Sequence, residues 1–347
     1  MDTDDVSEDV DKPSDDTEKK EEKIEQNDQR SVNQKTYRDF VEKYQESFLE
    51  EFDDESDYVK KDLDESLKDL NNLGKNNKMI NKLMPVMPMG KNTQPENESG
   101  FRTGKGTKTT ITPATKKLIE SDPLVKMQHQ GLKSAWNALS DEQRDLIGEF
   151  QIRASTKSGT IVGGTYNNDN KKLTVTLRPR ANMKRAFNNL HHEIGHAQYY
   201  KLMETSPDKV KKFNEAVKDA TFWGNSVTEY AGSFRGAKHK AEQYMKSAIS
   251  DIDSHIENSK KHPEKYQAVP DNYRKDAVKE LERRVKHAQT IYENETHSAL
   301  AQLVSGTNTS NVTIVTDKKN QHAITNSTGI RKEALEELFN AYKELHK

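Results

Sequence analysis

The chain has 347 residues, of which 31% are hydrophobic and 32% are charged, and its formal net charge is -2. This composition favours one modest folded core with solvated appendages over several well-packed domains. There is no cysteine, which excludes disulfides and thiolate metal sites and leaves His, Asp and Glu as the ligands of any metal. The lysines are interleaved with acidic residues, and no stretch has the roughly 18 apolar residues of a membrane span, so we expect neither a nucleic-acid nor a membrane partner.

The first third of the chain is expected to lie mostly outside the core. Residues 1–30 hold 13 acidic and 5 basic side chains, which predicts a disordered acidic tail over 1–35 and no secretory signal. We expect a soluble protein whose compartment the sequence leaves open, with the cytoplasm and a phage particle as the two options considered. Aromatic residues at helical intervals predict a helical segment over 36–74. The Lys-, Asn-, Gly- and Pro-rich residues 75–117 are interpreted as a flexible linker, whose Met/Pro cluster at 84–89 could dock on a partner or on the core.

Residues 118–347 are predicted to form the globular domain, with an α+β fold in which a small antiparallel sheet packs on a central helix and the second half is mainly helical. Two β-branched runs flank the turn-forming cluster at 167–170 and predict a hairpin, and Ser140 has the position of a helix N-cap. The predicted helices and strands are a helix ending near 140, strands at 161–166 and 173–177, helices at 183–203, 207–221, 226–259 and 271–305, a short strand at 312–315, and a helix at 329–346.

The most informative motif is His192-Glu193-Ile194-Gly195-His196, within the predicted helix at 183–203. Residues four apart differ by about 40° around a helix axis, so both imidazoles face the same side and can bind one zinc ion. Glu193 lies between them in angle and is placed to take a proton from an attacking water. His191 points away, and Gly195 keeps bulk off the metal face. The competing interpretation is a polar helix with three surface histidines.

A catalytic zinc requires a third protein ligand. Downstream, Asn294, Glu295 and Ser298 resemble the Asn-Glu-x-x-Ser helix of the gluzincin group of zinc peptidases, of which thermolysin is a member. The resemblance implies a zincin-like fold with His192, His196 and Glu295 as zinc ligands and Glu193 as general base. The family's aspartate after the serine is replaced here by Ala299, and 99 residues separate His196 from Glu295, which implies a helical insertion at about 237–290.

Glu229 is an alternative third ligand, 33 residues downstream of His196. Its surroundings also resemble the tyrosine-bearing segment of zinc peptidases of the anthrax lethal factor type. That resemblance implies that Tyr230 donates a hydrogen bond to the oxyanion of the transition state, rather than that Glu229 is a ligand.

The motifs together predict a zinc-dependent enzyme that hydrolyses peptide bonds in a protein or peptide substrate. A second hypothesis is a structural or interaction protein, such as a particle component or an effector, with a non-catalytic metal site. A third keeps the zinc hydrolase and changes its substrate, for example to cell-wall peptides.

Overall fold

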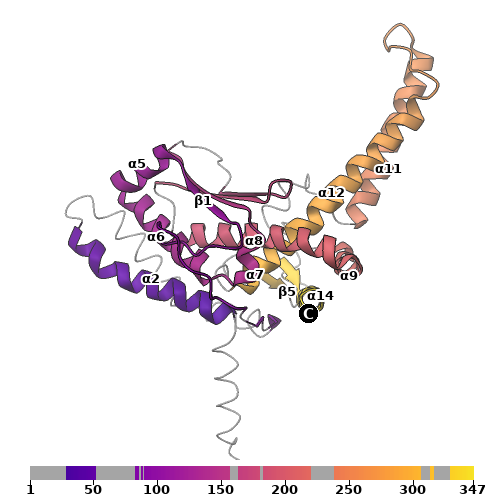
Figure 1. The fold of residues 1–347 in the computed structure, drawn as a ribbon. Helices are drawn as coiled ribbons and strands as arrows, with labels where there is room; N and C mark the ends of the chain where they lie inside the picture. The colour runs from indigo at the N-terminus through magenta and orange to yellow at the C-terminus, as the bar shows by residue number, and fades with distance from the viewer. Residues whose placement is uncertain are drawn as a thin grey trace, which may run out of the picture.

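The computed structural model describes residues 29–51, 83–85, 87–88, 90–156, 163–179, 183–219, 238–305, 313–315 and 329–347. These residues form a mixed α+β structure that is mostly helical and contains a four-stranded sheet, as predicted for the fold class (Figure 1). In the order in which they lie in the sheet, the strands are β1 (Lys108–Ile111), β2 (Glu149–Ala154), β4 (Lys172–Leu177) and β3 (Gly164–Asn167).

The sheet is not antiparallel throughout, which corrects the prediction. Strands β1, β2 and β4 are parallel, and only the edge pair β3–β4 is antiparallel. Strands β1 and β2 are parallel because α5 (Pro113–Ser121), α6 (Pro123–Ala138) and α7 (Asp141–Arg144) return the chain from the end of β1 to the start of β2, the kind of long crossover that parallel strands require.

The predicted hairpin is confirmed. The side chain of Asn167 accepts hydrogen bonds from the amides of Asp169 and Asn170, which fixes the turn between β3 and β4. On β4 the predicted apolar residues at 173, 175 and 177 are buried, but Thr174 is also only 8% exposed. β4 lies in the interior of the sheet, between β2 and β3, and its burial does not alternate strictly.

The long helix α8 (Met183–Thr205) and α6 pack side by side beneath the sheet. Trp136 of α6 stacks on Phe150 of β2 with ring centroids 4.1 Å apart, and Phe187 of α8 joins the same core. The first described helix, α2 (Gln29–Glu51), covers α6 and places Tyr37 4.9 Å from Phe187, ring centroid to ring centroid. This helix begins inside the segment predicted to be a disordered tail.

The segment predicted to be a linker also takes part in the fold. It carries β1 and the fully buried Phe101, and Met84 of the Met/Pro cluster packs in the apolar cluster of the C-terminal helices. Side-chain hydrogen bonds hold it against the rest of the fold: the buried Arg144 donates to the side chain of Asn92, and the backbone amide of Thr93 donates to the carboxylate of Asp141. Secondary structure is predicted mainly from the spacing of apolar residues. This segment is held largely by polar contacts to distant side chains, so its sequence does not show such a spacing.

We predict that Phe101→Ala destabilises the protein by about 3–5 kcal/mol, the usual cost of removing a buried aromatic ring. The Phe101 ring lies 5.9 Å from that of Phe150 in an edge-on contact that the substitution would remove. Chemical denaturation would measure the change, with the exposed Lys105→Ala as control. An unchanged midpoint for Phe101→Ala would show that the segment is a linker in solution.

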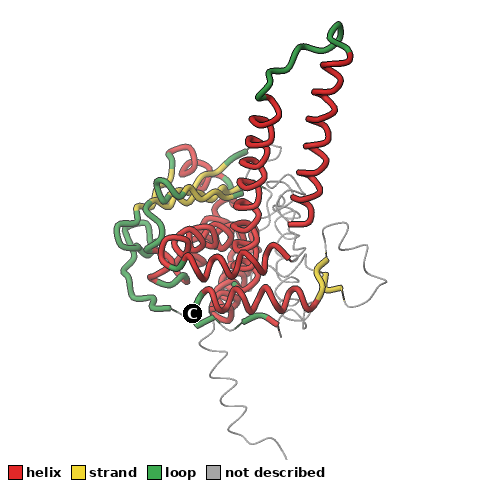
Figure 2. The backbone as a smooth tube through the Cα atoms, turned by 90° about the vertical axis from the view of Figure 1, so that its right-hand side faces the viewer, coloured by secondary structure: helices red, strands yellow, loops and turns green. Residues whose placement is uncertain are grey.

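The C-terminal half is helical. Its elements are α9 (Pro207–Asp219), α11 (Lys238–Lys261), α12 (Tyr273–Val304), β5 (Thr313–Val315), β6 (Gly329–Arg331) and α14 (Lys332–Leu345). Helix α11 and the first half of α12 pair and project from the body, over the residues for which the sequence predicts an insertion (Figures 1 and 2). Among the described residues, no helix has the length and apolar character needed to span a membrane.

Candidate metal centre

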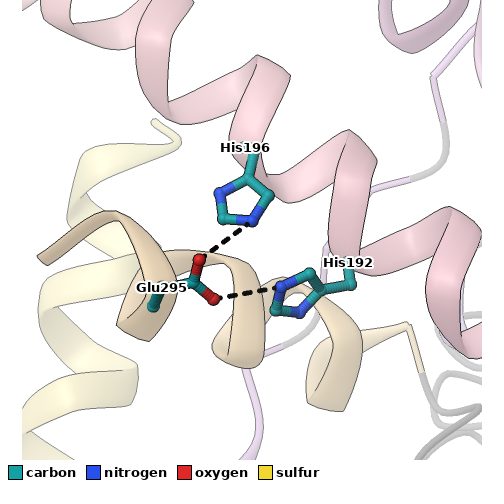
Figure 3. Close-up of side chains that lie close together, drawn as sticks. All are labelled: His192, His196 and Glu295. Atoms are coloured by element: carbon teal, nitrogen blue, oxygen red, sulfur yellow. Dashed lines mark ion pairs between the residues drawn. The ribbon is translucent and has the colours of Figure 1, made fainter. Parts of the chain in front are cut away.

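The candidate metal centre lies where α12 crosses α8. His192 and His196 extend from α8, and Glu295 extends from α12 toward both of them (Figure 3). The Nε2 atom of His192 lies 3.2 Å from Oε2 of Glu295, and the Nε2 atom of His196 lies 3.5 Å from Oε1. One donor atom from each residue falls within 4.8 Å of the others, and these three residues form the one such group in the described part of the chain.

These distances fit a zinc ion. Zinc binds imidazole nitrogen and carboxylate oxygen at about 2.0–2.2 Å, so neighbouring donors of a tetrahedral ion lie about 3.3–3.5 Å apart. The separations of 3.2 and 3.5 Å run to the two different oxygens of Glu295, so this carboxylate lies between the two imidazoles and within reach of an ion that both rings bind. Among the described residues the donors are two histidines and one carboxylate, and a zinc site with three protein donors keeps its fourth position for water or substrate.

Gly195 brings the two helices close enough for this arrangement. A Cβ atom at this position would lie 2.7 Å from the Cα of Ser298 and 2.9 Å from the Cβ of Ala301. Both distances are shorter than real Cβ contacts, so only glycine permits this approach of α12. Gly195 therefore does not keep the metal face clear, as the sequence suggests, but faces α12 and sets the distance at which Glu295 reaches the histidines.

We predict that Gly195→Ala weakens zinc binding at least about 10-fold and destabilises the protein by about 1–3 kcal/mol, because α12 must move outward. Competition with a fluorescent zinc chelator would measure the affinity. Gly148→Ala is the matched control, because a Cβ there would meet its nearest neighbour at an ordinary 3.4 Å. Equal zinc affinity in the two variants would contradict this role of Gly195.

Asn294 and Ser298 of α12 orient the ring of His196. The Nδ1 atom of His196 lies 3.0 Å from Oδ1 of Asn294 and 2.8 Å from Oγ of Ser298. An amide oxygen can only accept a hydrogen bond, so Nδ1 carries the proton and Nε2 keeps its lone pair for a metal. Burial lowers the pKa of His196 to about 4, with the charge of His192 acting in the same direction, so the ring is neutral at physiological pH.

Removing both contacts in the double variant Asn294→Ala, Ser298→Ala should lower zinc affinity about 10-fold to 100-fold, the usual effect of losing the hydrogen bonds that orient a ligand. Each single variant should lie between the double variant and the unsubstituted protein, because the other contact remains. Thr290→Ala, on the same helix face but outside this pair of contacts, is the control. Unchanged affinity in the double variant would contradict the orienting role.

The charges around Glu295 favour its ionised form. Burial acts to raise the pKa of this carboxyl, but the hydrogen bond from His192 and the electrostatic interaction with the two imidazoles lower it overall. Burial acts to lower the pKa of His192, and the same carboxylate raises it overall. The carboxylate therefore faces the two rings as an anion, the form that binds metal.

Glu193 lies beside the donors and is not one of them. Its side chain is 5% exposed and accepts a hydrogen bond from the backbone amide of Tyr166 on β3. Gly164 of the same strand lies so close that an added Cβ would be 2.7 Å from Oε1 of Glu193. Burial raises the pKa of Glu193 to about 7, with smaller opposing contributions from His192 and this amide. A carboxyl whose pKa is near neutrality is suited to accept and return a proton.

Three residues near the centre, Ala299, His191 and His297, do not belong to the donor group. Ala299, in place of the family's aspartate, packs with the apolar cluster of α9 and α14. His191 is not in the donor group, and burial lowers its pKa to about 4. His297, on the far side of α12 from Glu295, is fully buried, with its Nε2 atom 3.0 Å from that of His346. Glu229 and Tyr230 lie outside the described residues.

A cavity of about 300 Å³ opens at the donors. Strand β3 contributes Tyr166 to its wall, α8 contributes Tyr200, and α12 contributes His287, Thr290 and Ile291. The motifs do not indicate these residues. Helical spacing identifies two of them, because Tyr200 follows His196 by four residues and Ile291 precedes Glu295 by four.

No known protein family, curated protein or solved structure matches this chain. The chemical interpretation of the centre therefore depends on its own residues.

Proposed function

We propose that this chain is a zinc-dependent peptidase with a zincin-like catalytic domain. The observation that supports this most strongly is the convergence of His192, His196 and Glu295 with Glu193 beside them, at an open cavity bordered by an edge strand. A structural zinc is enclosed by four protein ligands, and the described residues provide three. This count favours a catalytic site over the non-catalytic alternative.

In the proposed mechanism, His192, His196 and Glu295 hold the ion. When bound, zinc polarises the scissile carbonyl and lowers the pKa of water. Glu193 takes the proton from the attacking water and passes it to the leaving amine, so the same carboxyl acts first as base and then as acid. The Tyr166 amide holds the Glu193 carboxylate in place between these steps.

Polypeptide is the proposed substrate because of strand β3. In the described sheet, β3 pairs with β4 on one side and is an edge on the other. An extended peptide can add to such an edge through backbone hydrogen bonds. Gly164, Thr165 and Tyr166 of this strand line the cavity next to Glu193, so a peptide along the edge would pass the donor group.

The test is proteolysis of an unfolded protein in heavy-oxygen water. Hydrolysis by water places one labelled oxygen in each new carboxyl group, which mass spectrometry of the fragments detects. We expect labelled fragments from the zinc-loaded protein and at least about 100-fold slower formation of them with the Glu193→Gln variant. Zinc binding without any new fragment would favour the non-catalytic hypothesis.

A further inference from the structure

We propose that Tyr166 and Tyr200 form a binding subsite for a large neutral side chain of the substrate, preferentially an aromatic one. This inference depends on the proposed function to the extent that it takes the substrate to be a polypeptide. It adds a specificity that none of the metal-binding motifs contains.

The two tyrosines come from different elements and meet at the cavity wall. Tyr166 belongs to β3 and Tyr200 to α8, and their ring centroids lie 6.2 Å apart with the planes tilted by 37°. Both side chains are half-buried and line the same cavity as the metal donors. Two tilted rings at this spacing present an apolar corner on which a third ring can stack or pack edge-on.

The subsite adjoins the reacting centre. Tyr200 lies one helical turn beyond His196, and the Tyr166 amide is the donor to Glu193. A side chain in this corner would therefore belong to a residue close to the scissile bond. Ile291, one turn before Glu295 on α12, adds an aliphatic surface to the cavity wall.

The charges of the cavity favour a neutral side chain. Apart from His192, Glu193, His196 and Glu295, the described lining residues include no Asp, Glu, Lys or Arg. Glu204 is close enough to affect Tyr166, but it is half-exposed and lies 3.8 Å from the ammonium group of Lys201. This carboxylate is already paired and so provides little attraction for a basic side chain.

The expected preference is substantial. Filling an apolar pocket with one more methylene changes affinity about 10-fold to 200-fold, so exchanging alanine for phenylalanine should improve binding at least about 10-fold. Tyr200→Ala should remove most of this difference. Tyr200→Phe, which keeps the ring and loses only the hydroxyl, should retain it.

The test measures binding by titration calorimetry with zinc-loaded Glu193→Gln protein, which should bind peptides without cutting them. The probes are blocked hexapeptides of alanine and glycine in which one Phe, Ala or Arg is moved through every position. We expect Phe to improve binding at one position, with the preference lost when Tyr200→Ala is added and kept with Tyr200→Phe. The exposed Tyr266→Ala, between α11 and α12, is the matched control and should change nothing.

Two results would overturn the inference: equal binding of the Phe and Ala peptides at every position, or a preference that survives Tyr200→Ala. Tighter binding of Arg than of Phe would also overturn it. The proposed function is tested separately by turnover of the same peptides with Glu193 intact. If the protein prefers the Phe peptide in binding but cleaves none of the peptides, the subsite proposal stands and the proposed peptidase function is wrong.

Discussion

Replacing Glu193 by Gln is expected to reduce peptide hydrolysis by about 100-fold to 10,000-fold, the usual contribution of a general base. The change is nearly isosteric, and the amide oxygen can still accept the hydrogen bond from the Tyr166 backbone. The three donor residues are untouched, so the variant should hold as much zinc as the unsubstituted protein. Initial rates on an unfolded protein substrate, with zinc content measured in the same samples, would test both expectations.

The pH dependence of hydrolysis provides a further test of Glu193. The base acts only as a carboxylate, so activity should fall as the pH drops through its pKa, which burial raises to about 7. A bound divalent cation favours the charged form and moves this limb to lower pH. If Glu193→Gln and the unsubstituted protein hydrolyse peptides at the same rate, Glu193 is not the base.

Replacing Glu295 by Ala is expected to remove zinc and activity together. The carboxylate supplies one of three protein donors, and without it the two imidazoles of α8 remain as a much weaker pair. Zinc should raise the melting temperature of the unsubstituted protein, because a ligand that binds only the folded state stabilises it in proportion to RT ln(1 + [L]/Kd). The variant should show no such increase at the same zinc concentration.

Two further variants accompany Glu295→Ala, one as a control and one as a test of the alternative ligand. Glu282→Ala removes an exposed carboxylate from the same helix and should leave zinc-dependent stabilisation unchanged. Glu229→Ala tests the alternative ligand, which lies outside the described residues. If only Glu229→Ala abolishes zinc binding, the third ligand is Glu229, and the resemblance to the lethal factor type becomes the better guide.

The ligands on α8 are predictable because the information is local. A spacing of four residues on a helix determines that His192 and His196 share a face, whatever surrounds them. The position of α12 relative to α8 cannot be predicted in this way. It depends on Gly195 meeting Ser298 across 103 positions of sequence, and neither residue alone indicates this contact. The Asn-Glu-x-x-Ser resemblance, rather than periodicity, is what points to Glu295.

In the sheet, one part can be predicted from the sequence and another cannot. The β3–β4 hairpin is visible because a turn-forming cluster separates two β-branched runs. Strand β1 is short and polar, and it is surrounded by residues typical of a linker, so its pairing with β2 has no local signal. Its place depends on the register with β2 and on Thr107, just before β1, whose hydroxyl donates to the carbonyls of Arg144 and Ile147; these are tertiary interactions.

The most direct test of the account is metal analysis of the purified, unsubstituted protein combined with a cleavage assay on an unfolded protein. We predict one zinc ion per chain, cleavage that stops when a chelator removes the ion, and recovery when zinc is added back. A protein that holds no zinc, or one whose cleavage activity is unaffected by removing the ion, would contradict the central claim.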